Sequence, residues 1–157
     1  MKPELLALLF GASVVCIALI AFSIKQFNIR RHNRISTRPS LRIDRREIID
    51  FPLKIILNNV GLGLAHIDRF EIQVDNILIS GEYKNIIERV ISLLGLNGFD
   101  IIFYPLNQSD EIEIKEPYTL FEANPINSTD HEIISSALHR LNYKIKYYSI
   151  YNEEFVL

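Results

Sequence analysis

Histidine and carboxylate side chains that could share a proton or a metal ion gather in one stretch of this 157-residue chain. Asp130, His131 and Glu132 are consecutive, and His139 follows eight residues after His131. Two imidazoles that bind one metal ion from a single helix face stand about four residues apart, so this spacing does not favour a metal site. The same four residues are the first place to look for acid–base chemistry. No second motif supports an enzyme.

The common covalent nucleophiles are missing. The single cysteine, Cys16, lies inside an apolar run, and no serine stands in a G-x-S-x-G pattern. One cysteine also excludes a disulfide scaffold, a zinc finger and a cysteine-ligated iron–sulfur cluster, because each needs several sulfur atoms close together. We therefore expect no catalytic residue, no metal site and no cofactor.

A pair of glycines has the spacing of a phosphate-binding turn but lacks its other parts. Asn59, Gly61, Gly63 and Ala65 follow a strand-like stretch, and His66 stands where the dinucleotide pattern requires a third glycine. No helical stretch follows, so neither a helix dipole nor a set of helix N-terminal amides would hold a phosphate. We interpret these residues as a structural turn in which the glycines supply φ values that larger residues avoid.

The elements that would position these residues begin with an apolar run from Leu5 to Ile24. Twenty helical residues at about 1.5 Å each cover roughly 30 Å, the thickness of a bilayer hydrocarbon core. We expect residues 1–24 to be an uncleaved transmembrane anchor. A cleaved signal peptide is the alternative, because residues 21–23 offer small side chains at the spacing that a signal peptidase uses. Small residues at 11–13 would let two anchors pack closely, which makes a homo-oligomer a further expectation.

Basic residues crowd the stretch after the apolar run. Cations beside a membrane segment stay on the cytoplasmic side, and each gains about 1 kcal/mol from anionic headgroups. We expect a basic juxtamembrane linker over residues 25–40. The prediction is an inner-membrane, single-pass protein with its N-terminus outside and residues 41–157 in the cytoplasm. The cations that carry it are Lys25, Arg30, Arg31, Arg34 and Arg38.

The remainder of the chain has the opposite charge. Residues 47–157 hold eight Lys or Arg and seventeen Asp or Glu, a net charge of −9. Such a surface is repelled by phosphate, so we expect no nucleic-acid partner. Tyrosines and lysines interleave near the C-terminus and could stack on bases. A strand with Tyr143, Ile145 and Tyr147 inward and Lys144 and Lys146 in water fits the same pattern better.

Apolar spacing predicts a mainly β domain over residues 41–157. A period of two predicts strands over residues 51–58, 69–79, 100–106, 111–121 and 143–155, with a hairpin tip at Asp75-Asn76. A period near 3.6 predicts two short helices: residues 83–94, closed by Gly95, and a second that starts in a capping box at 129–132. A β-sandwich or a short barrel follows from this order.

The pattern N-x-G-x-G-x-A at Asn59–Ala65, followed by Ile67, Phe70, Ile72 and Val74, resembles an uncharacterised group of bacterial single-pass membrane proteins. The closing stretch 147–153 is similar to the last strand and turn of that group. The resemblance implies an N-terminal transmembrane helix, a basic juxtamembrane stretch and a C-terminal β-sandwich. It implies no activity and no ligand.

These patterns predict a membrane-tethered, non-catalytic interaction module whose partners are the lipid bilayer and an unidentified protein. Tethering raises local concentration, so even a weak contact would be effective. The alternative is a small-molecule-sensing effector whose β-domain gates the association of the anchors. That alternative requires a concave pocket with convergent polar groups.

Overall fold

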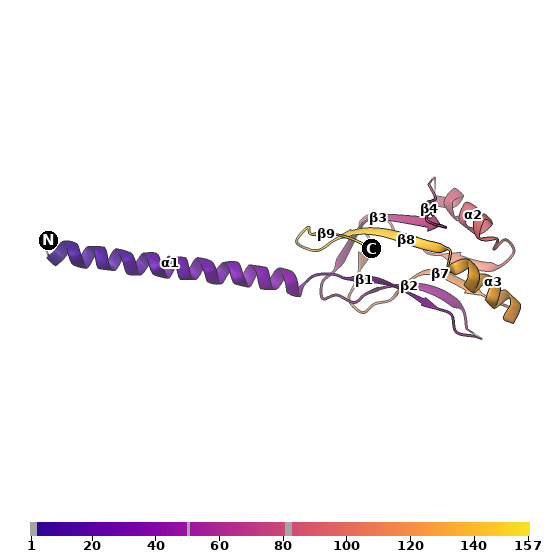
Figure 1. Ribbon diagram of the computed structural model, residues 1–157, viewed down its shortest axis with the longest axis horizontal. Helices are drawn as coiled ribbons and strands as arrows, with labels where there is room; N and C mark the ends of the chain where they lie inside the picture. The colour runs from indigo at the N-terminus through magenta and orange to yellow at the C-terminus, as the bar shows by residue number, and fades with distance from the viewer. Residues whose placement is uncertain (1–2, 50, 81–82) are drawn as a thin grey trace. The chain divides into compact units, whose positions relative to one another are not determined.

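The computed structural model describes residues 3–49, 51–80 and 83–157, with side chains described from residue 16 onward except at 83 and 84. The chain forms two compact units, Met1–Ser36 and Thr37–Leu157. Helix α1, Pro3–Ser36, makes up the first unit and is the indigo to purple helix in Figure 1. The helix thus includes most of the stretch 25–40 that we expected as a separate linker.

The described part of the chain does not support a transmembrane anchor. Among the residues with described side chains, no helix combines the length and the apolar character needed to cross a membrane. The first part of the expected anchor, residues 1–15, lies outside those side chains. From Cys16 to Ile35 the side chains of α1 are exposed, and they include Lys25, Arg30, Arg31 and Arg34.

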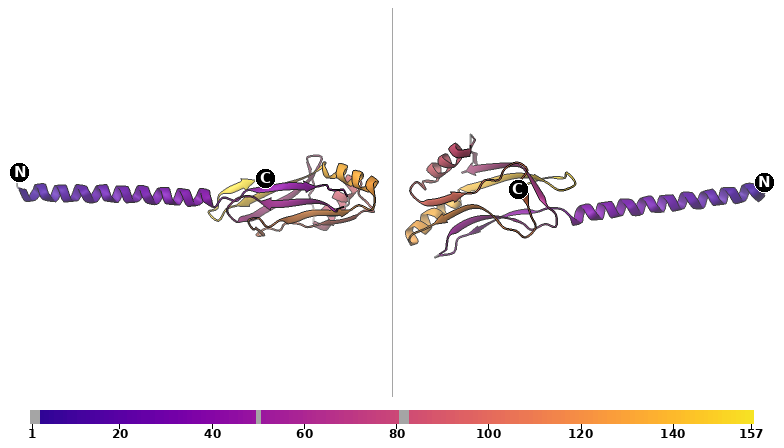
Figure 2. Two further views of the ribbon diagram at one scale, coloured as in Figure 1. Left: turned by 90° about the horizontal axis from the view of Figure 1, so that it is seen from below. Right: turned by 180° about the vertical axis from the view of Figure 1, so that it is seen from behind.

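Residues 37–157 fold as two antiparallel sheets packed face to face, which confirms the predicted mainly β, sandwich-like fold (Figures 1 and 2). The first sheet has the order β1-β2-β7-β5. Its strands are β1 (Leu41–Arg46), β2 (Leu53–Asn59), β5 (Asp100–Phe103) and β7 (Tyr118–Asn124).

The second sheet has the order β4-β3-β8-β9, and β6 pairs with the first residues of β3. Its strands are β3 (Ala65–Val74), β4 (Ile77–Leu78), β6 (Glu111–Ile112), β8 (Leu141–Tyr148) and β9 (Glu154–Val156). β3 and β8 pair from His66↔Tyr148 to Val74↔Leu141, with a bulge between Ile67 and Arg69. The bulge adds one residue to β3 and so shifts which side chains face the core.

Apolar side chains from alternating positions fill the space between the sheets. This burial removes apolar surface from water, which is the main favourable term in folding. β8 shows the predicted period of two, with Tyr143, Ile145 and Tyr147 inward. β2 follows it except at Ile56, which was expected outward but is buried beside a register shift between Ile55 and Ile56. The buried residues of that period in the two strands are Leu53, Ile55, Leu57, Leu141, Tyr143, Ile145 and Tyr147.

Two helices lie at the same end of the sandwich in Figures 1 and 2. Helix α2 (Tyr83–Leu94) has the predicted bounds and is followed by Gly95 at φ 73°, the left-handed conformation that ends many helices. Helix α3 (Ser128–Leu138) begins earlier than the predicted capping box, because the Asn127 side chain accepts the Asp130 N–H and acts as the N-cap. Ile133, expected inward, is exposed.

The predicted strands 100–106 and 69–79 differ from β5 and β3 only in their bounds, and larger differences occur at three other places. β1 was not predicted, because it has only two apolar residues among three arginines and an aspartate. These two, the buried Leu41 and the partly buried Ile43, alternate with charged residues. The stretch 111–121 is broken by Lys115 at φ 64°, so β6 and β7 belong to different sheets. The stretch 143–155 turns at Asn152, with φ 57°, and returns as β9 beside β8.

The predicted hairpin tip at Asp75-Asn76 is confirmed, and it leads to a stability prediction. Both residues have positive φ, 52° and 64°, as a two-residue type I′ turn requires. Glycine has no Cβ penalty in this conformation, so Asn76→Gly is expected to raise the free energy of unfolding by about 0.5 kcal/mol. Urea unfolding measures the change. An unchanged or lower midpoint would contradict this reading of the turn.

Candidate functional site

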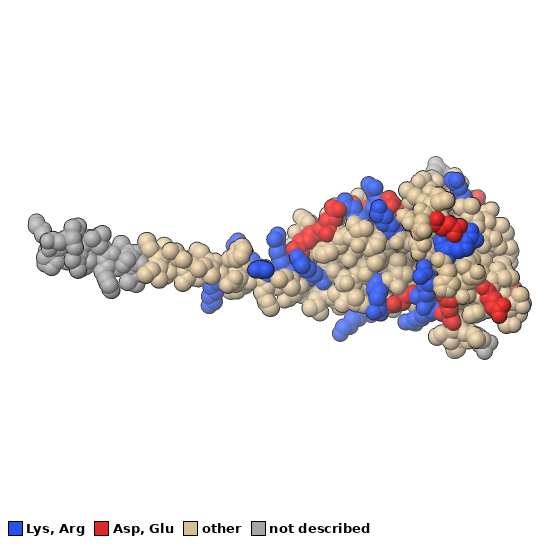
Figure 3. Space-filling model, viewed as in Figure 1, with Lys and Arg blue, Asp and Glu red and all other residues tan. Residues whose placement is uncertain are grey.

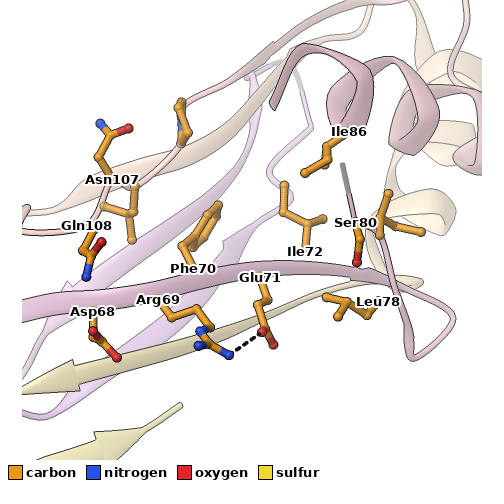
Figure 4. A pocket seen from close by; sticks show the side chains of 13 residues that line it. Asp68, Arg69, Phe70, Glu71, Ile72, Leu78, Ser80, Ile86, Asn107 and Gln108 are labelled. Atoms are coloured by element: carbon orange, nitrogen blue, oxygen red, sulfur yellow. Dashed lines mark ion pairs between the residues drawn. The ribbon is translucent and has the colours of Figure 1, made fainter. Parts of the chain in front are cut away.

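An open hollow of about 520 Å³ lies beside β3, between residues 78–80 and the segment 105–108. Its volume falls in the range of roughly 300–1,000 Å³ that is usual for binding pockets. Figure 4 shows the side chains that line it. They are Asp68, Arg69, Phe70, Glu71, Ile72, Leu78, Ile79, Ser80, Ile86, Pro105, Leu106, Asn107 and Gln108.

The floor of the hollow is apolar because β3 sends every second side chain to this face. In Figure 4, Phe70, Ile72 and Ile86 lie on the hollow's side of β3. The Phe70 ring stacks on the Tyr143 ring with 5.4 Å between centroids, and Ile72 and Leu106 are each 5% exposed. The polar amides of Asn107 and Gln108 stand at the rim. The arrangement suits an apolar group that enters with polar atoms left at the mouth.

The charged residues that line the hollow lie across β3 from its floor. Figure 4 places Asp68, Arg69 and Glu71 on the opposite side of the strand from Phe70. Arg69 and Glu71 are 3.7 Å apart, and the Lys146 ammonium is 3.4 Å from the Asp68 carboxylate. Surface pairs of this kind contribute little to stability. The charged side chains therefore lie on the face of β3 opposite to the apolar floor.

The sequence-predicted turn lies outside this hollow and is organised by one buried amide. The Asn59 side chain is 1% exposed, and its Nδ2 donates to the carbonyls of Gly63 (2.7 Å) and Ile112 (3.0 Å). Its Oδ1 accepts the N–H groups of Ser40 (3.2 Å) and Gly61 (3.1 Å). Asn59 thus joins the chain entering β1, the glycine turn and the residue at the end of β6.

The glycines of this turn are required by space, which corrects the reason given from the sequence. Neither Gly61 nor Gly63 has a φ in the left-handed region. A Cβ on Gly61 would meet the backbone of residues 38–40, and a Cβ on Gly63 would meet the Thr37 carbonyl, both well under 3.0 Å. Ala65 is fully buried at the start of β3. The turn therefore clasps residues 37–40 against the sandwich.

The histidine and carboxylate stretch does not converge on one point. Asp130 Oδ2 accepts the Ile126 N–H at 3.3 Å, which is a helix-start contact. His139 Nε2 is 3.8 Å from Glu47 Oε2, and that oxygen also accepts the Ser135 hydroxyl. His131 borders a separate hollow of about 100 Å³. Among the described residues, no group of three His, Cys, Asp or Glu side chains is placed to hold a metal ion.

Arg38, predicted to contact lipid headgroups, forms an ion pair with Glu153 of the β-domain. Its Nε and Nη2 donate to the two oxygens of Glu153, each at 3.1 Å, in the bidentate geometry that arginine favours. These hydrogen bonds and the adjacent negative charge raise the pKa of Arg38. The ion pair thus connects Arg38, at the start of the β-domain, to Glu153 in the turn that precedes β9.

A second bidentate pair makes stability depend on pH. Arg140 contacts both Asp75 oxygens, at 3.0 and 2.7 Å, and these hydrogen bonds lower the pKa of Asp75. A lowered pKa adds stability above the unfolded value of about 3.9, and that stability is lost as the pH falls through the folded value. Asp75→Asn is therefore expected to be less stable than the parent chain at pH 7.

The destabilisation by Asp75→Asn is expected to shrink as the pH falls from about 5 to 2, because the parent's carboxylate is protonated there. Urea unfolding at several pH values measures it. Asp100→Asn is the matched control, since within the described residues the Asp100 carboxylate accepts a side-chain hydrogen bond only from the neutral Asn124 amide, at 2.9 Å. A constant difference between parent and Asp75→Asn across this pH range would contradict the assignment.

Sequence reasoning missed the hollow. Its walls come from β3, the residues around β4, Ile86 of α2 and the segment 105–108. Each contributes ordinary apolar or polar residues that carry no chemical motif of their own. The bulge between Ile67 and Arg69 helps to shape this part of β3, but it could not be read from the alternation of residues 69–79, so the sequence held no signal for the hollow.

Comparison with known proteins identifies no relative. The chain matches no protein-family model, and searches of curated proteins and of solved structures find no match. The resemblance to bacterial single-pass membrane proteins is therefore wrong, because no family model supports it and no described helix could cross a membrane. Its motif residues, Asn59 to Ala65, are instead explained by the clasp around residues 37–40.

Proposed function

We propose that residues 37–157 are a non-catalytic interaction module that binds a partner protein through the hollow beside β3. The observation that carries this proposal is the form of the hollow: an apolar floor of Phe70, Ile72 and Leu106, an open mouth and a polar rim. Apolar anchors surrounded by polar groups are typical of protein-binding surfaces.

The charge of the β-domain supports a partner that is basic near the contact. Residues 37–157 hold twelve Lys or Arg and eighteen Asp or Glu, a net charge of −6. Figure 3 shows that both signs are interspersed over the visible face. An excess of negative charge speeds the approach of a basic partner and disfavours a phosphate-rich one.

The proposed place of action is the cytoplasmic side of the inner membrane. The exposed Lys25, Arg30, Arg31 and Arg34 of α1 would contact the anionic headgroups of that membrane. A reporter fused after Leu157 is expected to be active only in the cytoplasm, and the chain is expected to sediment with membranes at low salt. A chain that stays in the soluble fraction at low salt would contradict the headgroup contact.

The partner is tested by purifying the tagged 157-residue chain in mild detergent and identifying both proteins and small molecules that come with it. We expect one protein in near-equal amount, and its loss from a Leu53→Asp control, because a charge at this fully buried position unfolds the sandwich. Purification of the chain without any protein at equal amount would contradict the proposal.

A small-molecule-sensing effector is the second candidate, and the volume of the hollow favours it. About 520 Å³ would admit a metabolite. Against this, the described amides and charges lie at the rim and across β3, so few polar groups converge on the floor. A metabolite retained through purification, with no protein companion, would support this candidate over the first.

A further inference from the structure

Within the described part of the chain, the outer edge of β3 is paired at both ends and has no backbone partner in the middle. Near its start, the Ile67 N–H donates to the Asp110 carbonyl and the Ser109 N–H donates to the Ile67 carbonyl, each at 2.8 Å. Near its end, the Ile79 N–H donates to the Ile72 carbonyl at 3.0 Å. Within the ranges that the structure describes, no residue forms a backbone hydrogen bond with this edge between positions 68 and 71.

The backbone of Phe70 faces this open stretch. Phe70 stands opposite Ile145 of β8, and Ile145 bonds with Leu157 on its far side, donating at 3.0 Å and accepting at 2.9 Å. Opposed residues of an antiparallel pair exchange both hydrogen bonds or neither. The N–H and C=O of Phe70 therefore point away from β8, toward the outer edge. An open edge of this kind is a template for another extended chain.

The hollow lies at this same stretch of β3. A residue added opposite Phe70 would place its side chain on the same face as the Phe70 ring. Figure 4 shows that this face leads into the hollow, toward Ile86. The residues before and after it would lie on the other face, beside Arg69 and Glu71. A segment with one apolar residue between two polar residues would therefore match both the apolar hollow and the charged face with Arg69 and Glu71.

We propose that a partner protein binds here as an extended segment that adds a short strand to the outer edge of β3. Phe70 exchanges backbone hydrogen bonds with the segment, and an apolar side chain of the segment fills the hollow between Phe70 and Ile86. The net charge of −6 on residues 37–157 favours a basic segment. This inference rests on the proposed function and names its site and its class of partner.

The test measures binding of three synthetic pentapeptides to the isotope-labelled 157-residue chain in detergent micelles by NMR. The first is acetyl-Lys-Thr-Ile-Thr-Lys-amide, the second replaces isoleucine with serine, and the third carries an N-methyl group on the isoleucine nitrogen. We expect the first to shift the Phe70 amide signal and to slow its hydrogen exchange. The serine and N-methyl peptides are expected to bind about tenfold more weakly or worse.

Equal affinity of the three peptides would overturn the inference, because binding would then depend on neither the hollow nor the backbone edge. Signal changes that omit residues 69–72, or no binding by the first peptide at millimolar concentration, would overturn it as well. A peptide that binds only at another face would have the same consequence.

A pair of variants tests the site without removing a core residue. Ser80 lines the hollow and is exposed, and Ser128 is an exposed serine at the start of α3. Ser80→Trp adds bulk at the hollow and is expected to weaken binding of the first peptide about tenfold, whereas Ser128→Trp leaves it unchanged. Equal affinities of the two variants would contradict the placement.

The outcomes separate this inference from the proposed function. If a partner protein copurifies and Ser80→Trp does not weaken its retention, the proposed interaction function is supported and the strand-addition site is wrong. If no partner copurifies from cells yet the peptides behave as expected, the edge is a binding site and the cellular function is wrong.

Discussion

Replacing Asn59 with alanine is expected to lower the free energy of unfolding by about 3–5 kcal/mol. The substitution removes one fully buried amide and leaves its four backbone partners, on Ser40, Gly61, Gly63 and Ile112, without their hydrogen bonds. Buried polar groups that lose a partner cost about 1–3 kcal/mol each, and partial relaxation reduces the sum. Urea unfolding followed by circular dichroism measures the change.

Asn58→Ala is the matched control for this prediction. Asn58 is the preceding residue, and its half-buried side chain donates one hydrogen bond, to Asp44 Oδ2 at 2.6 Å. Its loss is expected to cost about 1 kcal/mol. Asn59→Asp keeps one accepting oxygen but turns the other toward two carbonyls, so it should destabilise nearly as much as alanine. Similar unfolding midpoints for the parent chain and Asn59→Ala would contradict the role of this amide.

Gly63→Ala is expected to lower the free energy of unfolding by about 3 kcal/mol, because the added methyl group would meet the Thr37 carbonyl. The Thr37 carbonyl belongs to the backbone, and the backbone also fixes the position of the alanine methyl group, so no rotamer change relieves the overlap. The segment 37–40 would have to move away from the turn at residues 60–63. Hydrogen exchange is expected to increase at the Val60 and Leu62 amides, which donate to Ser40 and Arg38 at 2.8 and 2.9 Å.

Gly95→Ala is the control for an added methyl group without a clash. Gly95 has φ 73° and nothing within 4 Å of the added Cβ, so the cost is only the strain of the left-handed conformation, about 1 kcal/mol. If Gly63→Ala were no more harmful than Gly95→Ala, or if the exchange of Val60 and Leu62 amides were unchanged, the close approach of the turn to residues 37–40 would be wrong.

The architecture of residues 37–157 could be predicted from the sequence wherever one period dominates. The alternating apolar residues of Leu53–Leu57 and the apolar stripe of α2 each face the core. In the strand, a register shift of one residue would turn its whole apolar face to solvent. The Asp75-Asn76 tip was predictable because few residues tolerate two successive positive φ values. Bounds failed where a single residue, such as Lys115 or Asn152, turns the chain.

The candidate site could not be predicted, because it depends on how β3 pairs with its neighbouring strands and not on a sequence motif. Phe70 carries the same alternation as its neighbours in β3, and only the register against Ile145 shows which way its backbone points. Asn59 and Gly63 were predicted as residues of a turn. Asn59 ends β2, and the contacts that require both residues are made with residues 37–40, about twenty positions earlier. Non-local contacts of this kind leave no local signal.

Site-specific photocrosslinking in living cells tests most directly whether the hollow is where a partner binds. A benzoylphenylalanine placed at Ser80 of the full chain would lie at the hollow, and one at Ser128 would lie on α3. We predict a single crosslinked protein from position 80, joined through a short extended segment, and none from position 128. The same crosslinked protein from both positions, or none from position 80, would contradict the account.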